Sequence, residues 1–161
     1  MALQKIISGG QTGVDRGALA AALAAAFPCG DWCPADRQAE DGSIPAQFPV
    51  TPLPRGGYRE RTLKNVLDSD ATLILFRGEL TGGTLLTRTF CQRHGKPHLV
   101  IDAAQTRGAV AVGLIVRFVE RHGIATLNVA GPRLSGWPEG EAFSARVVGE
   151  VLKAQTRRAG E

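Results

Sequence analysis

Three glycine-rich loops in this 161-residue chain have the composition of anion-binding sites. They read ISGGQTGVD at 7–15, GELTGGT at 78–84 and GPRLSG at 131–136. Glycines allow positive φ and a close approach of the backbone, so main-chain N–H groups can point at a phosphate. Thr12 adds a hydroxyl donor, and Arg133 adds a planar guanidinium suited to an oxyanion. The candidate binding residues are Gly9, Gly10, Gln11, Thr12 and Gly13 in the first loop, Gly82, Gly83, Thr84 and Thr87 in and just after the second, and Gly131, Arg133 and Ser135 in the third.

Each loop alone is also compatible with an ordinary tight turn, so the argument rests on the position that the loops share. In an open parallel sheet, ligands bind beyond the carboxyl ends of the strands, where loops lead into helix N-termini. All three loops follow predicted strands, so we expect them at one edge of the sheet, where helix dipoles attract an anion. Neither G-x-G-x-x-G nor G-x-x-x-x-G-K-[ST] occurs, so the usual dinucleotide and P-loop fingerprints are absent.

Several charged residues outside the glycines have more than one interpretation. Asp15 is suited either to cap the first helix or to accept hydrogen bonds from a ligand's amino and hydroxyl groups. The segment DRQAEDG at 36–42, with Arg37 as a further candidate binding residue, is either a lid over the sheet edge or a solvated charged turn. Arg59 and Arg61 fall at a predicted helix start, where the dipole disfavours cations. That local conflict indicates a role with an anion.

The cysteines and histidines do not predict a metal or a nucleophilic site. Cys29 and Cys33 have C-x-x-x-C spacing, which fits neither a redox pair nor a zinc framework, and with Cys91 they form an odd set, so we expect free thiols. His94 and His122 precede glycines at predicted helix ends, where a cationic side chain suits the helix dipole. No H-x-x-x-H or comparable ligand spacing occurs.

The elements that must position the loops alternate between strands and helices, which predicts one α/β domain over residues 1–161 with a Rossmann-like, mostly parallel sheet covered by helices on both faces. The segment 28–58 contains six prolines and is expected to be a long functional loop. Residues 109–116 are apolar on every side, so they fit either a strand or a helix buried all round, the latter against another subunit. The predicted strands are 3–8, 71–76, 96–102 and 125–131, and the predicted helices are 15–27, 59–70, 85–94, 109–121 and 141–157.

Composition excludes several classes of protein. The hydrophobic fraction is 43%, charged residues make up 21%, and no apolar run approaches the roughly 20 residues that span a bilayer, so we expect no membrane insertion. The N-terminus leads straight into the first loop without a cleavage signature, which favours a cytoplasmic protein. The net charge of +4 is carried by scattered arginines, and aromatic residues make up only 6%. This pattern does not predict nucleic-acid binding; a basic surface that collects a small anionic ligand explains it equally well.

Five motifs in fixed order resemble the molybdenum cofactor carrier family, within the SLOG superfamily of Rossmann-like domains. They are SGGQTGVDRGAL, WCPADRQAEDG, YRERTLKNVLDSDATLIL, LTGGTLLT and NVAGPRLS, which together run over nearly the whole chain. The resemblance implies a cytoplasmic homo-oligomer that binds, stores and transfers molybdenum cofactor (molybdopterin), an anionic pterin whose phosphate and molybdate ends lie at the glycine loops. It further implies molybdoenzymes or cofactor-biosynthesis proteins as partners, and binding without covalent chemistry.

Two rival functions remain open from the sequence. The lysine-decarboxylase-like branch of the same superfamily resembles nucleoside monophosphate phosphoribohydrolases, which carry P-G-G-x-G-T-x-x-E. Here the comparable stretch is TGGTLLT at 81–87, and no glutamate follows within the motif. Glu40, Asp41 or Asp15 could supply the carboxylate from elsewhere. The other rival is a nucleotide-binding module that performs no chemistry.

Overall fold

Six parallel strands form the central sheet of the computed structural model, which describes residues 2–161. The spatial order is β5-β2-β1-β8-β6-β7, and every neighbouring pair is parallel. All six residues of the strand ATLILF are buried, as expected of a parallel strand covered on both faces. The strands are β1 (Lys5–Ile7), β2 (Cys29–Cys33), β5 (Val50–Pro52), β6 (Ala71–Phe76), β7 (His98–Asp102) and β8 (Thr126–Ala130).

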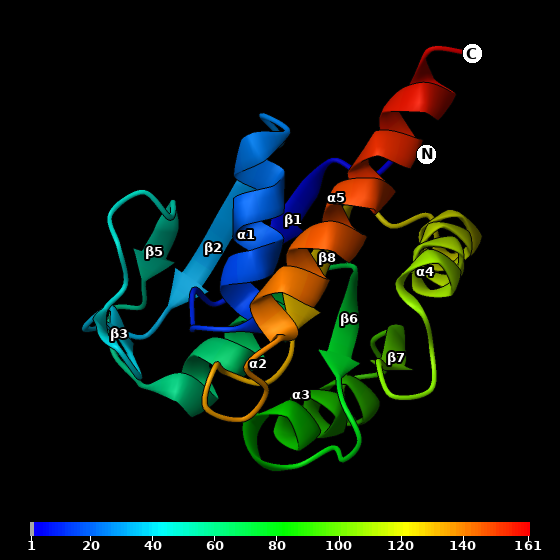
Figure 1. The fold of residues 1–161 in the computed structure, drawn as a ribbon. Coiled ribbons are helices and arrows are strands. Elements are labelled where there is room, and N and C mark those ends of the chain that lie inside the picture. Colours follow the sequence, from blue (N-terminus) through cyan, green and yellow to red (C-terminus); the bar gives the residue numbers. More distant parts are fainter. Residues whose placement is uncertain (1) are drawn as a thin grey trace.

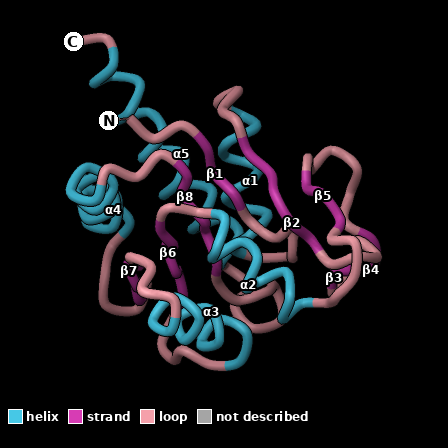
Figure 2. Tube along the Cα trace, turned by 180° about the vertical axis from the view of Figure 1, so that it is seen from behind, coloured by secondary structure: helices cyan, strands magenta, loops and turns pink. Residues whose placement is uncertain are grey.

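Five helices cover the two faces of the sheet, which confirms the predicted Rossmann-like α/β class. On one face lie α1 (Val14–Ala24), α4 (Gly108–His122) and α5 (Gly140–Ala159), with α1 packed along α5 (Figure 1). On the other face lie α2 (Tyr58–Asp68) and α3 (Gly82–Arg93), which stand in front of the sheet when the molecule is seen from behind (Figure 2). No helix among residues 2–161 has the length and apolarity required to cross a membrane.

The segment 28–58 is not the long irregular loop that its prolines predicted. It contributes β2 and β5 to one side of the sheet, and a short hairpin of β3 (Gln38–Ala39) and β4 (Gly42–Ser43) between them. The sequence CGDWC of β2 has weak strand propensity, with Gly30 and Asp31 both at positive φ. Pairing with β1 and β5 on its two sides holds it extended nevertheless.

The ambiguous apolar segment 109–116 is helical. It forms the start of α4, whose residues Ala111, Ile115 and Val119 recur every four positions and are completely buried. That spacing places them on one helix face, against β7 and α5. The helix ends at Gly123, which adopts the left-handed conformation at the C-cap.

The late strand β8 lies in the middle of the sheet, between β1 and β6. The loops that follow these three strands begin at Ser8, Arg77 and Gly131. Because all strands run in one direction, their carboxyl ends meet at one edge, as the sequence predicted. This arrangement brings the three glycine loops together although up to 120 residues separate them in the chain.

Candidate anion-binding site

A cavity of about 570 Å³ opens at the carboxyl ends of β1, β6 and β8, between α2 and α3. Its volume lies within the range of small-molecule binding sites. All three glycine-rich loops reach it, but not all of their residues do. The sequence-predicted residues in the lining are Gly9, Gln11, Asp15, Gly82, Gly83, Thr84, Thr87, Gly131, Arg133 and Ser135, whereas Gly10, Thr12, Gly13 and Arg37 are outside it.

The N-terminus of α3 is open to the cavity. Gly82, Gly83 and Thr84 form the first turn of this helix, and their N–H groups have no partner within the described part of the chain. Thr81, the N-cap residue, makes no side-chain capping bond. A Cβ atom at Gly82 or Gly83 would meet nothing within 4 Å, so there is open space above the turn. Free N–H groups and the positive end of the dipole together make an anion-binding site.

Four arginines surround the same space: Arg59 and Arg61 from α2, Arg77 after β6, and Arg133 after β8. The guanidinium of Arg59 lies 5.1 Å from the centre of the Phe90 ring, and that of Arg133 lies 6.0 Å from the Tyr58 ring. Stacking of this kind holds a guanidinium in place without using its N–H donors. Those donors therefore stay available for an oxyanion, apart from the Nε of Arg133, which lies 4.0 Å from Glu40 Oε2.

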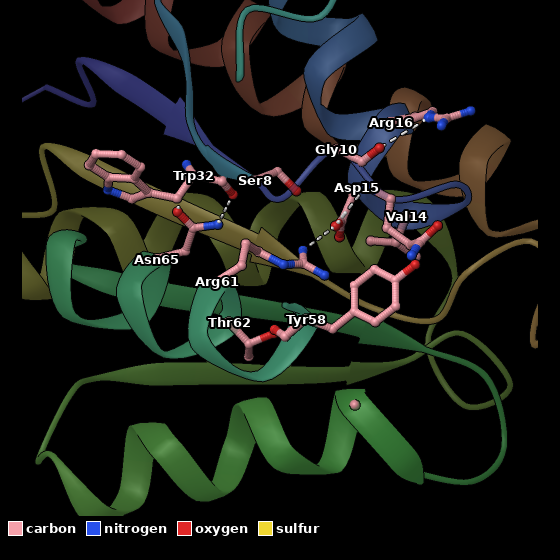
Figure 3. Close-up of polar contacts among 12 residues, drawn as sticks. Ser8, Gly10, Val14, Asp15, Arg16, Trp32, Tyr58, Arg61, Thr62 and Asn65 are labelled. Atoms are coloured by element: carbon pink, nitrogen blue, oxygen red, sulfur yellow. Dashed lines mark hydrogen bonds and ion pairs between the residues drawn. The ribbon is translucent and has the colours of Figure 1, made fainter. Parts of the chain in front are cut away.

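Arg61 is the cavity arginine with the shorter ion pair; the other, between Arg133 Nε and Glu40 Oε2, measures 4.0 Å. Its Nη1 lies 3.0 Å from Asp15 Oδ2, and Figure 3 shows the side chain reaching from α2 to the start of α1. Both side chains are largely buried, with 12% and 5% exposed. Burial raises the pKa of Asp15, although Arg61 and the Gln11 N–H counteract the shift. The guanidinium lies over Gly9, where a Cβ atom would overlap it.

Hydrogen bonds within the chain occupy the first glycine loop. The Thr12 hydroxyl donates to Glu40, and the Thr12 and Glu40 N–H groups both donate to the side-chain oxygen of Gln11. The first N–H of α1, on Val14, donates to the Pro132 carbonyl. A Cβ atom at Gly13 would lie 2.5 Å from that same carbonyl oxygen. The hydroxyl and the N–H of Thr12 and the first N–H of α1 are therefore bonded to the protein itself.

The charged segment 36–42 forms hydrogen bonds and an ion pair with this loop and the start of α1. Glu40 accepts hydrogen bonds from the N–H of Ser135 (3.0 Å) and from its hydroxyl (2.6 Å). The hydroxyls of Ser135 and Thr12 lower the pKa of Glu40. Asp41 forms a two-pronged ion pair with Arg16, at 2.6 and 2.8 Å. Neither a solvated turn nor an open lid describes these contacts, which join the β3–β4 hairpin to the loops after β1 and β8.

Arg37, a predicted binding residue, lies within this hairpin segment. Its guanidinium donates to the carbonyl oxygens of Val50, Ile44 and Pro45 at 2.9 to 3.2 Å. These bonds fix the chain between β4 and β5 and use most of the donors of the side chain. Its contact with a ligand stays a prediction that no described interaction supports.

Comparison with known proteins adds the family. The model of the circularly permutated YpsA SLOG family matches residues 6–152. This chain belongs to that family. A solved structure described as a "Putative molybdenum carrier protein", from Syntrophus aciditrophicus SB, is similar at 43% identity, covering 93% of this chain and 94% of the other, with a TM-score of 0.90. Comparison with curated proteins gave no match. The SLOG resemblance seen in the five motifs is thereby confirmed.

Among the residues that line the cavity of this SLOG chain, sequence reasoning missed Tyr58, Arg77 and Asn128, as well as several others. Arg77 directly follows the buried strand ATLILF, so the rule that ligands bind beyond strand ends would have found it. Asn128 is a polar residue flanked by Leu127 and Val129 in the strand TLNVA, which is a weaker signal of the same kind. Tyr58 has no comparable signal, because an aromatic residue at a helix start is unremarkable.

Proposed function

We propose that the cavity binds a small, phosphate-bearing anionic ligand and holds it without covalent chemistry. The observation that carries this proposal is the convergence of the free α3 N-terminus with Arg59, Arg77 and Arg133 around one space. Asp15 compensates the charge of Arg61, and Glu79 is the other carboxylate in the described lining. The remaining excess of positive charge favours a ligand with more than one negative charge.

Molybdenum cofactor is the ligand that we propose. Three features fit its parts. The open α3 turn offers N–H groups for a phosphate, and the Nε atom of Arg61 is buried without a partner beside Gly9, where a second anionic end would satisfy it. Tyr58 offers an aromatic face at the rim for a planar ring. Bound there, the cofactor would bring its own redox chemistry, while the chain orients it and shields it from water. The similar structure from Syntrophus aciditrophicus is described as a "Putative molybdenum carrier protein", which supports this choice of ligand.

A nucleotide is the alternative ligand, with hydrolysis of its glycosidic bond as the associated reaction. Two of the three candidate carboxylates, on Glu40 and Asp41, are not part of the cavity lining and bind Thr12, Ser135 and Arg16 instead. Asp15 lines the cavity and has the raised pKa that a general acid requires, but its bond to Arg61 occupies one oxygen.

Calorimetric titration decides between these ligands. The purified protein is titrated anaerobically with molybdenum cofactor and, separately, with AMP, and the AMP sample is then analysed for free adenine. We expect tight binding of the cofactor and intact AMP. Preferential binding of AMP would replace the cofactor by a nucleotide, and release of adenine would make the protein a hydrolase. Binding of neither would refute the proposed site.

A matched pair of variants locates the binding. Arg77→Ala removes a guanidinium from the cavity, and Arg93→Ala removes the same charge from the opposite end of α3. Loss of one charged hydrogen bond should weaken cofactor binding about tenfold in Arg77→Ala. Arg93→Ala should bind as the wild type does. Equal weakening in both variants would indicate non-specific attraction to a basic surface.

The wider biological role is part of the same proposal. A binding protein without chemistry of its own would store the cofactor and transfer it to molybdoenzymes, or receive it from cofactor-biosynthesis proteins. Homo-oligomeric assembly and a cytoplasmic location remain predictions of the sequence. Analytical ultracentrifugation with and without cofactor would measure the assembly directly.

A further inference from the structure

Asn128 occupies the floor of the cavity in the middle of β8. Its neighbours Leu127 and Val129 belong to the main hydrophobic core, together with residues of α1 and α5. Because side chains alternate along a strand, Asn128 points to the opposite face, where α2, α3 and the cavity lie. It is part of the cavity lining and only 3% exposed.

The hydrogen bonds around Asn128 leave one atom unused. Its side-chain Nδ2 donates to the hydroxyl of Thr72, the residue directly opposite on β6, at 3.2 Å. Within residues 2–161, no group donates to the carboxamide oxygen of Asn128. This oxygen is not among the buried side-chain atoms of the described residues that lack a partner, so it is open to the cavity, where a donor on a ligand can reach it.

A parallel strand buried on both faces normally carries Val, Ile or Leu at such a position. Thr72 and Asn128 form a polar pair across two central strands, where apolar residues would pack as well. The pair holds the amide with its nitrogen toward β6, so the oxygen is the part of the side chain left for the cavity. This is the arrangement expected of a group that recognises a donor on a bound ligand.

We propose that Asn128 determines specificity for the ring of the bound ligand. This inference rests on the proposed function. Its carboxamide oxygen accepts a hydrogen bond from the N–H or amino group of a planar heterocycle, while the phosphate of the same ligand lies at the α3 N-terminus and the arginines. The chemical class selected is a phosphorylated ring with a donor edge, such as the 2-amino-4-oxopyrimidine edge that pterins share with guanine.

The test compares two probes that differ in the ring. GMP carries the donor edge and a phosphate, and ribose 5-phosphate carries the phosphate without a ring. We expect wild-type protein to bind GMP more tightly. In Asn128→Ala, GMP should bind about tenfold more weakly while ribose 5-phosphate is unaffected. Asn128→Asp keeps an acceptor oxygen, so it should retain the ratio of the two dissociation constants although the added charge weakens both.

A purely structural role for Asn128 would weaken both probes alike in Asn128→Ala, and that result would overturn the inference. So would wild-type protein that binds the two probes equally, which would leave the proposed anion site intact. Failure to bind either probe by a protein that binds molybdenum cofactor would overturn this inference alone, whereas failure to bind the cofactor as well would refute the proposed function. If the alanine variant does not fold, Asn128→Val offers the same comparison, because valine suits a buried strand and has no acceptor.

Discussion

The loop after β1 and the loop after β6 look alike in the sequence and differ in the structure. Both are rich in glycine, and both lead from a parallel strand into a helix. In the first, Glu40, Gln11 and the Pro132 carbonyl already accept hydrogen bonds from the hydroxyl and the N–H of Thr12 and from the first N–H of α1, on Val14. In the second, the start of α3 has no such partners among the described residues.

The glycines of the two loops therefore serve different purposes. Gly13, at φ +82°, lets the chain pass within contact distance of the loop after β8, and so joins two parts of the protein. Gly83 has no neighbour within 4 Å of a Cβ position, and so leaves space for something that is not protein. A glycine-rich loop after a strand is thus evidence for a ligand only once its neighbours are known.

The largest expected effect concerns Arg61, which connects α2 to the first loop. Arg61→Ala leaves the buried carboxylate of Asp15 without its cation and should lower the free energy of unfolding by about 3 kcal/mol. Lys64→Ala is the matched control, since it breaks an ion pair with Asp68 on the same helix, in which both side chains are at least one-third exposed. It should cost less than about 0.5 kcal/mol. Urea denaturation of both variants checks this.

The opposite outcome would be equal destabilisation by the two substitutions. It would mean that the ion pair with Arg61 does not offset the cost of burying the Asp15 carboxylate. A further variant sharpens the test: adding Asp15→Asn to Arg61→Ala removes the carboxylate that was left unpaired, and should restore part of the lost stability.

An intermediate effect separates the glycines of the two loops. Gly13→Ala forces a Cβ atom against the Pro132 carbonyl at a positive φ and should destabilise the fold by about 2 kcal/mol. Gly83→Ala adds the same atom in open space and should change stability by no more than about 0.5 kcal/mol. Thermal unfolding at fixed protein concentration measures both. Similar melting temperatures for the two variants would remove the distinction between the loops.

The smallest expected effect concerns Glu40, whose carboxylate accepts hydrogen bonds from the hydroxyls of Thr12 and Ser135. Glu40→Gln should lose about 1 kcal/mol at pH 7 from weakened bonds to Ser135 and Thr12. The pKa of Glu40 is lowered in the folded protein, so its contribution is complete above its ordinary pKa of 4.5 and is lost as the pH falls below that value. Asp15 has a raised pKa and shifts stability in the opposite direction, equally in both proteins.

Unfolding free energies between pH 3 and pH 7 measure the Glu40 effect. Wild type and Glu40→Gln should differ at pH 7 and converge at the acid end. A difference that is constant over this range would show that the charge of Glu40 does not contribute.

The periodicity of the sequence predicted the fold class and the shared edge of the loops, since buried strands and amphipathic helices carry strong local patterns. It missed β2 and β5, because Gly30 and Asp31 disfavour a strand locally and the pairing with β1 overrides them. The helix α4 was ambiguous for a different reason. It carries more apolar residues than its buried face can hold, and some of them lie on the exposed face; Val110, for example, is 55% exposed.

The candidate site was only partly predictable. The conflict between Arg59, Arg61 and the helix dipole indicated an anion, and both residues line the cavity. No local pattern revealed that Glu40 would bind Thr12, 28 residues earlier, or Ser135, 95 residues later. Such partners depend on which loops the fold brings together, and that information lies in the strand order.

The central position of β8 has a consequence for how the chain emerges from the ribosome. β1 and β6 share no hydrogen bonds, so the two halves of the sheet stay unconnected until residues 126–130 have been synthesised. Asn128 and the loop after β8 arrive with that strand. Long-range closure of this kind is late and slow. The cavity is therefore completed in the same step that completes the sheet.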